Sequence, residues 1–293
     1  MTNNEKIAAI KTGRIIRAGR KSHGWTQIEV AKTLGITQGA LSKMEAGKLI
    51  PSVQQWFEFC RSGSIPFDSL FFGYLDRLQP VTLQESISNQ NFKINEIYTE
   101  YAGSTARSLF PLIGWAEQKL GPEKINSLWK ALGVDPDYFV DLSNPINFRF
   151  FADFTALLKS EGLFKKSDFQ KITRPLSDGK NHGLLNQTYQ QDLSVEPLFK
   201  TVFSNSSMYE VNFNYVLEEA SQNKVVFSAT PNSHLLSERQ LGFYECQDFL
   251  PAYRTCYFEN ILSLLPHKTV LQTREFSSRA KGEHRFIHEI HFR

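Results

Sequence analysis

The 293-residue sequence is poor in the features that mark secreted and membrane-spanning proteins. It has only three cysteines, Cys60, Cys246 and Cys256, and their wide separation argues against a disulfide framework. No run approaches the ~18 uninterrupted apolar residues that a membrane helix needs, and the first residues lack the basic-then-apolar order of a signal peptide. We therefore expect a cytoplasmic protein with no membrane partner.

The sequence also lacks the short motifs of common catalytic sites. It has no glycine-rich phosphate loop, no Gly-x-Ser-x-Gly elbow and no His-Glu-x-x-His motif. His284, His288 and His291 fall on one predicted strand, where the last points away from the face that the other two share. Asp135 and Asp137 flank a proline, which is typical of a helix start. We expect no enzyme activity, no catalytic residue, no cofactor and no metal site.

What the sequence does contain is a globular composition with an uneven distribution of charge. The length favours two domains, and 41% of the residues are hydrophobic. Residues 1–70 carry ten Lys and Arg against five acids, whereas the remainder carries 23 basic and 25 acidic residues. A compact basic module therefore precedes a larger, nearly neutral domain, as in a nucleic-acid reader attached to another domain.

Helix-start and helix-stop signals divide the basic module into short helices. A first amphipathic helix ends near residues 22–24, and its apolar stripe comprises Ile7, Ile10, Ile15 and Ala18. Thr26 and Glu29 have the spacing of a capping box for a second helix, whose apolar surface comes from Ile28, Val30, Ala31 and Leu34. Gly35 closes that helix, and Thr37 can cap a third one over residues 38–46. Two short helices joined by a tight turn predict a helix-turn-helix.

The third predicted helix has one face that can contact base edges. Leu41 faces inward, and the opposite face holds Gln38, Gly39, Ser42 and Lys43. Gln can bond to an adenine edge through two hydrogen bonds, Ser can donate or accept, and Lys can reach a phosphate or a guanine. The alternative interpretation is a small helical bundle with a polar surface.

Several motifs follow one another in the basic module. They are Gly13-Arg14-Ile15-Ile16-Arg17, Arg20-Lys21, Gly24-Trp25-Thr26-Gln27, Val30-Ala31, Leu34-Gly35-Ile36, Leu41-Ser42-Lys43-Met44-Glu45-Ala46-Gly47 and Pro51-Ser52. In this order, residues 7–72 resemble the Cro/C1-type (XRE) helix-turn-helix family. The resemblance implies an all-α five-helix DNA-binding domain over residues 1–73, with a fourth helix at 53–60 and a fifth at 66–72.

The resemblance also implies the roles of individual residues. Gln27 would contact backbone phosphate, while Gln38, Ser42 and Lys43 would lie in the major groove. Gly39 departs from the pattern, because it offers no side chain where many relatives place a second base reader.

The resemblance also implies a structural role for two residues, because Arg20 and Glu45 occupy the positions of the family's buried ion pair.

The expected partner is a double-stranded DNA operator. One such domain buries little surface, so we expect a homodimer on paired half-sites of this operator, with the larger domain forming the dimer.

The rest of the chain predicts a linker at residues 74–92 and an α+β domain at 93–293, in which helices pack on a small antiparallel sheet. Helical periodicity extends from 94 to about 169 and returns near Phe199. Alternating patterns predict hairpins at 209–217 with 224–229 and at 269–276 with 285–292. A long helix is expected at 240–265, kinked or divided by Pro251.

The end of the chain has a second resemblance. It rests on a helix from Cys246 through Tyr257 and on the closing strand 286–292, with Pro266, Val270, Glu275 and Gly282-Glu283 between them. These residues resemble 4-vinyl reductase-like and haem-NO-binding-like sensory domains. Ser278 and Phe286 stand where some 4-vinyl reductase-like domains have zinc-binding cysteines, so zinc is not expected.

Aromatic residues are abundant outside the basic module. The chain has 24 Phe, 10 Tyr and 4 Trp, and such rings line apolar ligand pockets as well as ordinary cores. The candidate pocket residues lie on the predicted long helix and are Phe243, Cys246, Phe249, Tyr253 and Tyr257. We expect a transcription regulator whose larger domain dimerises and senses an apolar or aromatic small molecule. A domain that binds a protein or peptide, and an enzyme fused to a DNA reader, are the alternatives.

Overall fold

The computed structural model forms two compact units. It describes all residues except 1–2, 78, 84–91, 179–181, 183–184, 190–193, 237–245, 247–248, 266 and 279–284. Unit 1 comprises residues 1–79, 88–95 and 129–144, and unit 2 comprises 80–87, 96–128 and 145–293. In the described part of the chain, no helix combines the length and the apolar character needed to cross a bilayer.

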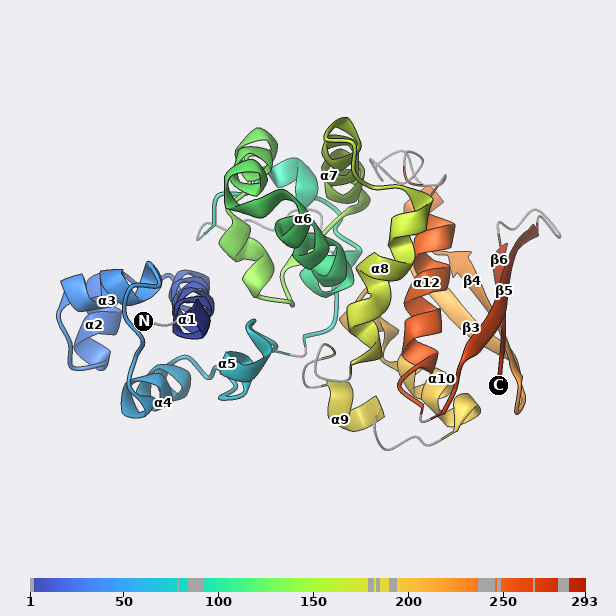
Figure 1. Cartoon of the computed structure of the whole chain (residues 1–293), viewed down its shortest axis with the longest axis horizontal. Coiled ribbons are helices and arrows are strands. Elements are labelled where there is room, and N and C mark those ends of the chain that lie inside the picture. The colour runs from blue at the N-terminus through green and yellow to red at the C-terminus, as the bar shows by residue number, and fades with distance from the viewer. Residues whose placement is uncertain are drawn as a thin grey trace. The chain divides into compact units, whose positions relative to one another are not determined.

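Unit 1 is all-helical, as predicted for the N-terminal domain. Its elements are α1 (Asn3–Ser22), α2 (Gln27–Thr33), α3 (Gln38–Glu45), α4 (Val53–Ser62), α5 (Ser69–Phe72) and η2 (Pro136–Val140), together with the end of α6 (Ala106–Leu132) (Figure 1). Their starts follow local chemistry. Thr26 and Glu29 form the predicted capping box of α2, and Ser52 forms a second one at α4. Gly35 takes the left-handed φ of +63° that the turn between α2 and α3 requires.

The core of unit 1 lies between α1 and the helices that cover it. Among its fully buried side chains are Ile15, Leu41 and Phe59, and Trp56 is 2% exposed. Two residues expected to contribute apolar surface do not, because Ile10 is 53% exposed and Ile28 is 70% exposed. The sequence periodicity predicted helices at both positions, but the buried faces of α1 and α2 are narrower than expected.

The boundary of unit 1 differs from the expected division at residue 73. Leu75 is fully buried in the core cluster of unit 1, its N–H donates to Val140 O (2.8 Å), and Leu142 N–H donates to Leu75 O (3.0 Å). The segment 129–144, expected in the larger domain, thus belongs to the compact unit of the helix-turn-helix. The reason is hydrophobic: Leu75 and Val140 cannot be buried in this core unless both segments join it.

Unit 2 has the α+β composition predicted for the larger domain. Its helices are most of α6, then α7 (Phe148–Ser160), α8 (Phe169–Thr173), α9 (Leu185–Tyr189), α10 (Val195–Ser204) and α12 (Leu250–Leu262). Its short 3-10 turns are η1 (Glu96–Tyr98), η3 (Lys166–Asp168), η4 (Arg174–Ser177), η6 (Ser206–Met208) and η7 (Ser233–Leu236). Its strands are β1 (Ser104–Thr105), β2 (Pro145–Ile146), β3 (Phe213–Ala220), β4 (Lys224–Pro231), β5 (Val270–Ser278) and β6 (Arg285–Phe292).

The main sheet of unit 2 is antiparallel, with strand order β3-β4-β6-β5. Both predicted hairpins are therefore confirmed, although the first strand begins at Phe213 and not at Tyr209. Helix α12 contacts β5 and β6, and α8 lies beside α12 (Figure 1). The turn of the second hairpin, including Gly282, Glu283 and His284, lies outside the described residues.

The helices of unit 2 depart from the sequence pattern where Gly and Pro interrupt it. α6 consists of two helical segments joined at Gly121, whose φ is +73°, just before Pro122. The predicted helix at 240–265 is shorter in the described part, where α12 begins at Leu250 with Pro251 in its first turn. Proline suits that position because it removes an N–H that has no helical partner.

Candidate nucleic-acid interface and ligand cavity

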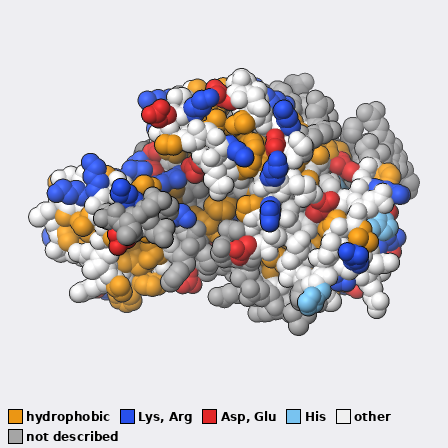
Figure 2. Space-filling view, viewed as in Figure 1, with side chains coloured by type: hydrophobic (Ala, Val, Ile, Leu, Met, Phe, Trp, Pro, Cys, Tyr) orange, Lys and Arg blue, Asp and Glu red, His pale blue; other side chains and the backbone are white. Residues whose placement is uncertain are grey.

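Helix α3 presents the predicted base-reading face to the outside. Thr37 caps it by accepting from Ala40 N–H (3.1 Å), and the buried side chains of Leu41 and Met44 anchor its inner face. The four predicted reading positions, Gln38, Gly39, Ser42 and Lys43, are all exposed. Figure 2 shows Lys and Arg side chains near α3, whereas exposed hydrophobic side chains gather over α4.

A chain of hydrogen bonds joins the predicted phosphate contact to the predicted base reader. Gln38 Nε2 donates to Gln27 Oε1 (2.5 Å), and Gln27 Nε2 donates to Glu45 Oε2 (2.8 Å). Glu45 in turn pairs with Arg20, whose Nε lies 2.5 Å from Oε1. The predicted Arg20–Glu45 ion pair is therefore present, and it also fixes the amide of Gln27. This arrangement orients Gln38 before any DNA is bound.

Gly39 lies in the middle of the reading face, and its surroundings are open. A Cβ built on Gly39 would meet no atom within 4 Å. By contrast, a Cβ on Gly13 would lie 2.3 Å from Met44 O, because α1 and the end of α3 approach each other closely at that point. The two glycines thus have different reasons for lacking a side chain: close contact at Gly13 and open space at Gly39.

Three acidic residues of segment 129–144 form ion pairs with basic residues of the first 79 residues. Asp137 pairs with Arg17, whose Nη2 donates to Oδ1 (2.8 Å), and it also lies 3.3 Å from Lys21 Nζ. Lys21 pairs with Asp135 as well. The third acid, Asp141, lies 3.2 Å from the guanidinium of Arg77. We call Arg17, Lys21, Arg77, Asp135, Asp137 and Asp141 the acid–base cluster of unit 1.

The acid–base cluster changes the interpretation of two predicted helix-start residues. Asp135 does cap η2 by accepting from Asp137 N–H (3.0 Å), as predicted. Burial opposes ionisation of Asp137, yet the hydrogen bond from Arg17 and the charges of Arg17, Lys21 and Arg14 hold its pKa below the ordinary value. The hydrogen bond to Asp137 raises the pKa of Arg17. Two cations of α1 are therefore neutralised within unit 1 and contribute less to a DNA-facing charge.

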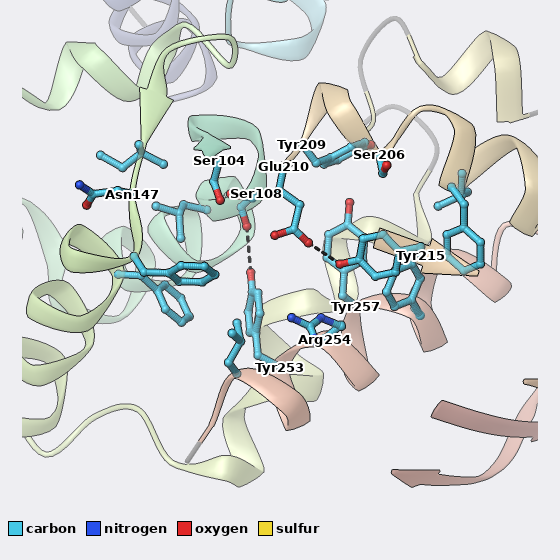
Figure 3. Close-up of a pocket in the computed structure, with 18 residues that line it drawn as sticks. Ser104, Ser108, Asn147, Ser206, Tyr209, Glu210, Tyr215, Tyr253, Arg254 and Tyr257 are labelled. Carbon is cyan, nitrogen blue, oxygen red and sulfur yellow. Dashed lines mark hydrogen bonds between the residues drawn. The ribbon is translucent and has the colours of Figure 1, made fainter. Parts of the chain in front are cut away.

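Unit 2 contains a largely apolar cavity of about 100 Å³. Its lining residues come from α6, α7, α10, α12, β1, β2, β3 and the chain around η6. They are Ser104, Ser108, Leu109, Ile146, Asn147, Phe148, Phe151, Val202, Phe203, Ser206, Tyr209, Glu210, Tyr215, Leu250, Tyr253, Arg254, Tyr257 and Phe258 (Figure 3).

The predicted pocket residues are only partly at this cavity. Tyr253 and Tyr257 line it, and Tyr253 OH donates to Ser108 O (3.3 Å). Cys246 is fully buried elsewhere, with Sγ 3.8 Å from Phe148 O, and Phe249 makes a tilted contact with Phe151 and an edge contact with Phe164. Phe243 lies outside the described residues. The apolar helix was correctly identified, but consecutive turns of it face different neighbours.

The charged residues of the cavity were missed by the sequence analysis. Figure 3 shows Glu210 and Arg254 entering the same space from opposite sides, between Tyr253 and Tyr257. Glu210 accepts a hydrogen bond from Tyr215 OH. Burial raises the pKa of Glu210, while Arg254 and the hydrogen bonds from Tyr215 and Asn212 act in the opposite direction. The feature of the sequence that could have indicated a charged cavity is the single arginine within the apolar run of α12.

Two buried histidines lie elsewhere in unit 2. His182 contacts Leu176 O through Nε2 (2.7 Å), and burial lowers its pKa to about 4. His288 stacks on Phe227 with ring centres 4.8 Å apart, and burial lowers its pKa to about 3. His291 pairs with Glu289 on β6. No group of three or more potential metal ligands occurs among the residues that the structure describes.

Comparisons with known proteins bear on the two units differently. No curated protein matches the sequence. Two solved structures match in fold over 64% of this chain and 96% of their own chains. One is a Cs H-NOX mutant carrying 4-cyano-L-phenylalanine (TM-score 0.44, 12% identity), and the other is an Fe(II) unliganded H-NOX mutant from K. algicida (TM-score 0.43, 10% identity). This likeness is too distant to assign a function.

Unit 1 has a direct match to a family model. Residues 16–68 match the model described as Helix-turn-helix, and they extend from α1 to the residue before α5. The capped helices α2 and α3, the left-handed turn at Gly35 and the exposed face of α3 agree with that match. The N-terminal part of the chain is therefore a helix-turn-helix domain of the kind that DNA-binding transcription regulators carry.

Proposed function

We propose that this protein is a sequence-specific transcription regulator that binds DNA through α3 and a small, largely apolar molecule in the cavity of unit 2. The observation that carries the proposal is the presence of both features in one chain: an exposed, pre-oriented reading face and a mostly buried cavity. Occupancy of the cavity would change the affinity for DNA, because a ligand shifts the equilibrium toward the state that it binds better.

The character of the cavity favours a small molecule over a peptide. Most of its lining side chains are buried, including Leu109, Ile146 and Phe151, whereas a peptide would need an exposed groove. An engineered apolar cavity of about 150 Å³ holds one benzene. A ligand of about one aromatic ring is therefore the size that we propose for a cavity of about 100 Å³.

A haem group, which the name of the haem-NO-binding-like domains implies for them, does not fit the lining. A cavity of about 100 Å³ is far smaller than a porphyrin, and no histidine or cysteine is among its described lining residues. The proposal therefore includes no haem.

A catalytic role has one observation in its favour, which is the perturbed Glu210 in the cavity. Its carboxylate is engaged by Tyr215, however, and no histidine or cysteine lines the described cavity to form a Ser–His or Cys–His nucleophile. We therefore favour binding over catalysis at this site.

Homodimerisation is part of the proposal because a single helix-turn-helix reads only one half-site. The expected result is a two-fold higher mass for the full chain in sedimentation equilibrium, and binding sites selected from random duplexes that contain two half-sites. A monomer at all concentrations that selects one half-site would contradict this part of the proposal.

The DNA-reading face can be tested by substitutions on α3. We expect Gln38→Ala and Ser42→Ala each to reduce the discrimination between selected and scrambled duplexes by ~1–3 kcal/mol, because each removes a base contact. Lys43→Ala should weaken binding to all duplexes and reduce the salt slope by about 1 if Lys43 meets phosphate. Fluorescence anisotropy over a salt series measures both quantities.

The matched control is Lys119→Ala, which removes an exposed lysine of α6 in unit 2. It should change neither discrimination nor salt slope. Equal effects of Lys43→Ala and Lys119→Ala, or unchanged discrimination in both Gln38→Ala and Ser42→Ala, would contradict the assigned reading face.

The sensing part of the proposal needs a separate measurement. Native mass spectrometry of the full chain purified from cells should show a bound small molecule, and adding the extracted molecule to the ligand-free protein should change its DNA affinity. An empty protein whose DNA affinity is indifferent to cell extract would count against sensing.

A further inference from the structure

Arg254 is a buried cation in an apolar part of unit 2. It lies on α12 among Tyr253, Phe258 and Ile261, and only 5% of it is exposed. The guanidinium carbon lies 3.8 Å from the centre of the Phe213 ring, so an aromatic face covers one side of it. A charge in such a place is costly unless a partner compensates it.

The hydrogen-bonding capacity of Arg254 is incompletely used. Its Nη1 is buried and has no hydrogen-bond partner in the described part of the chain. Nearly all buried polar groups in proteins are paired, and an unsatisfied charged donor is more expensive than a neutral one. The unpaired Nη1 belongs to a residue that lines the cavity.

The acid on the other side of the cavity does not supply the missing partner. Glu210 is held by Tyr215 OH and lies 3.5 Å from Asn212 Nδ2, which both donate to it. These bonds orient the carboxylate toward Tyr215 and Asn212. Glu210 therefore moderates the charge of the cavity, while Nη1 of Arg254 has no hydrogen-bond partner among the described residues.

From these observations we infer that the cavity binds a small aromatic or short aliphatic carboxylate, whose carboxylate accepts from Arg254 and whose apolar part contacts the walls. A guanidinium matches a carboxylate in both charge and geometry. The apolar walls include Leu109, Phe151 and Val202, and the cavity of about 100 Å³ holds about one ring. This inference rests on the proposed function, because it names the ligand class of the same cavity.

The test compares acids with their uncharged amides on the full chain. Benzoate, phenylacetate and hexanoate are each paired with the primary amide, and toluene serves as a purely apolar probe. Isothermal titration and the rise in Tm measure binding. We expect at least one acid to bind about 10- to 100-fold more tightly than its amide, because the charge-assisted bond is absent from the amide.

The variant Arg254→Met keeps the length of the side chain and removes the charge. It should fold, since replacing a buried charge by an apolar side chain of similar size is often tolerated, and it should bind toluene but lose the preference for the acid. Arg254→Gln should retain an intermediate preference. The matched control is Arg274→Met, which removes an exposed arginine of β5 and should keep the wild-type preference.

The outcomes separate this inference from the proposed function. Amides or toluene that bind as tightly as every acid would overturn the carboxylate inference and leave a ligand cavity. An acid preference that survives in Arg254→Met would also overturn it. If no acid, amide or toluene binds, both the inference and the proposed cavity ligand fail. The comparison in the wild-type protein decides the question even if a variant does not fold.

Discussion

At the scale of single residues, Gly13 and Gly39 differ in the space that is available for a side chain. A Cβ on Gly13 would lie 2.3 Å from Met44 O and 3.0 Å from Glu45 O, and both atoms are backbone. We expect Gly13→Ala to lower the free energy of unfolding of unit 1 by ~1–3 kcal/mol, because the helices must separate to admit the methyl group. Urea unfolding followed by circular dichroism measures the change.

Gly39→Ala is the matched control for that substitution. Both glycines lie inside helices, but the Cβ of Gly39 would meet nothing within 4 Å. Alanine should therefore stabilise α3 by roughly 0.5–1 kcal/mol, through its better helix propensity. Equal destabilisation by the two substitutions would contradict the assigned close contact at Gly13.

Local sequence patterns predicted contacts between neighbouring elements and missed those between distant segments. The Thr26–Glu29 capping box was predicted because it is a short motif with fixed spacing, and the Arg20–Glu45 pair was implied by the resemblance to a known family. The Arg17–Asp137 bond joins residues 120 positions apart, and no local periodicity contains that information. For the same reason Glu210 and Arg254 were not recognised as neighbours.

At the scale of elements, η2 and its acids complete the helix-turn-helix unit. Asp137 is almost fully buried and contacts Arg17 and Lys21 of α1. We expect Asp137→Asn to lower the free energy of unfolding of unit 1 by ~1–3 kcal/mol, since it leaves Arg17 without its acid and leaves Lys21 with Asp135 alone. Hydrogen exchange at the amides of α1 in the full chain measures the loss of protection.

The control for Asp137→Asn is Asp153→Asn in unit 2. Asp153 also pairs with an arginine, Arg149, but its side chain is 29% exposed. Because Asp153 belongs to unit 2 and α1 to unit 1, this change should leave protection of α1 unaltered. If Asp137→Asn also left α1 unaltered, residues 129–144 would not stabilise the helix-turn-helix unit.

For α12, the sequence predicted the helix but not which of its residues line the cavity. Its apolar composition and the position of Pro251 were visible in the sequence, and the helix was expected. Which of its turns faces the cavity depends on α6, α7 and α10, which the helix meets only in three dimensions. Consequently Tyr253 and Tyr257 lie at the cavity, whereas Cys246 and Phe249 are not among its lining residues.

At the scale of the whole molecule, charge is divided between the two units. Unit 1 has 13 basic and 9 acidic residues, and unit 2 has 20 basic and 21 acidic residues. The positive excess thus remains with the helix-turn-helix unit, although the acids of segment 129–144 reduce it. A nearly neutral unit 2 has little electrostatic attraction for DNA, and this fits a division between reading and sensing.

The stability of the whole chain should fall in mildly acidic solution because of two buried histidines. In the unfolded chain a histidine titrates near pH 6.5, whereas the pKa is about 4 for His182 and about 3 for His288 in the folded protein. Between these values the unfolded state binds protons that the folded state does not. The stabilisation is therefore complete above pH 6.5 and decreases as the pH falls, by ~1.4 kcal/mol per pH unit for each histidine.

Glu210 acts in the opposite direction, because its raised pKa lets the folded state take up a proton first. The histidine contribution is therefore isolated by comparing wild type with His288→Gln in urea unfolding from pH 7.5 to 4.5. The variant should be less stable at pH 7.5, where His288 packs on Phe227, but its stability should fall less steeply below pH 6.5, by ~1.4 kcal/mol per unit. Parallel pH curves for the two proteins would show that His288 is not held neutral by burial.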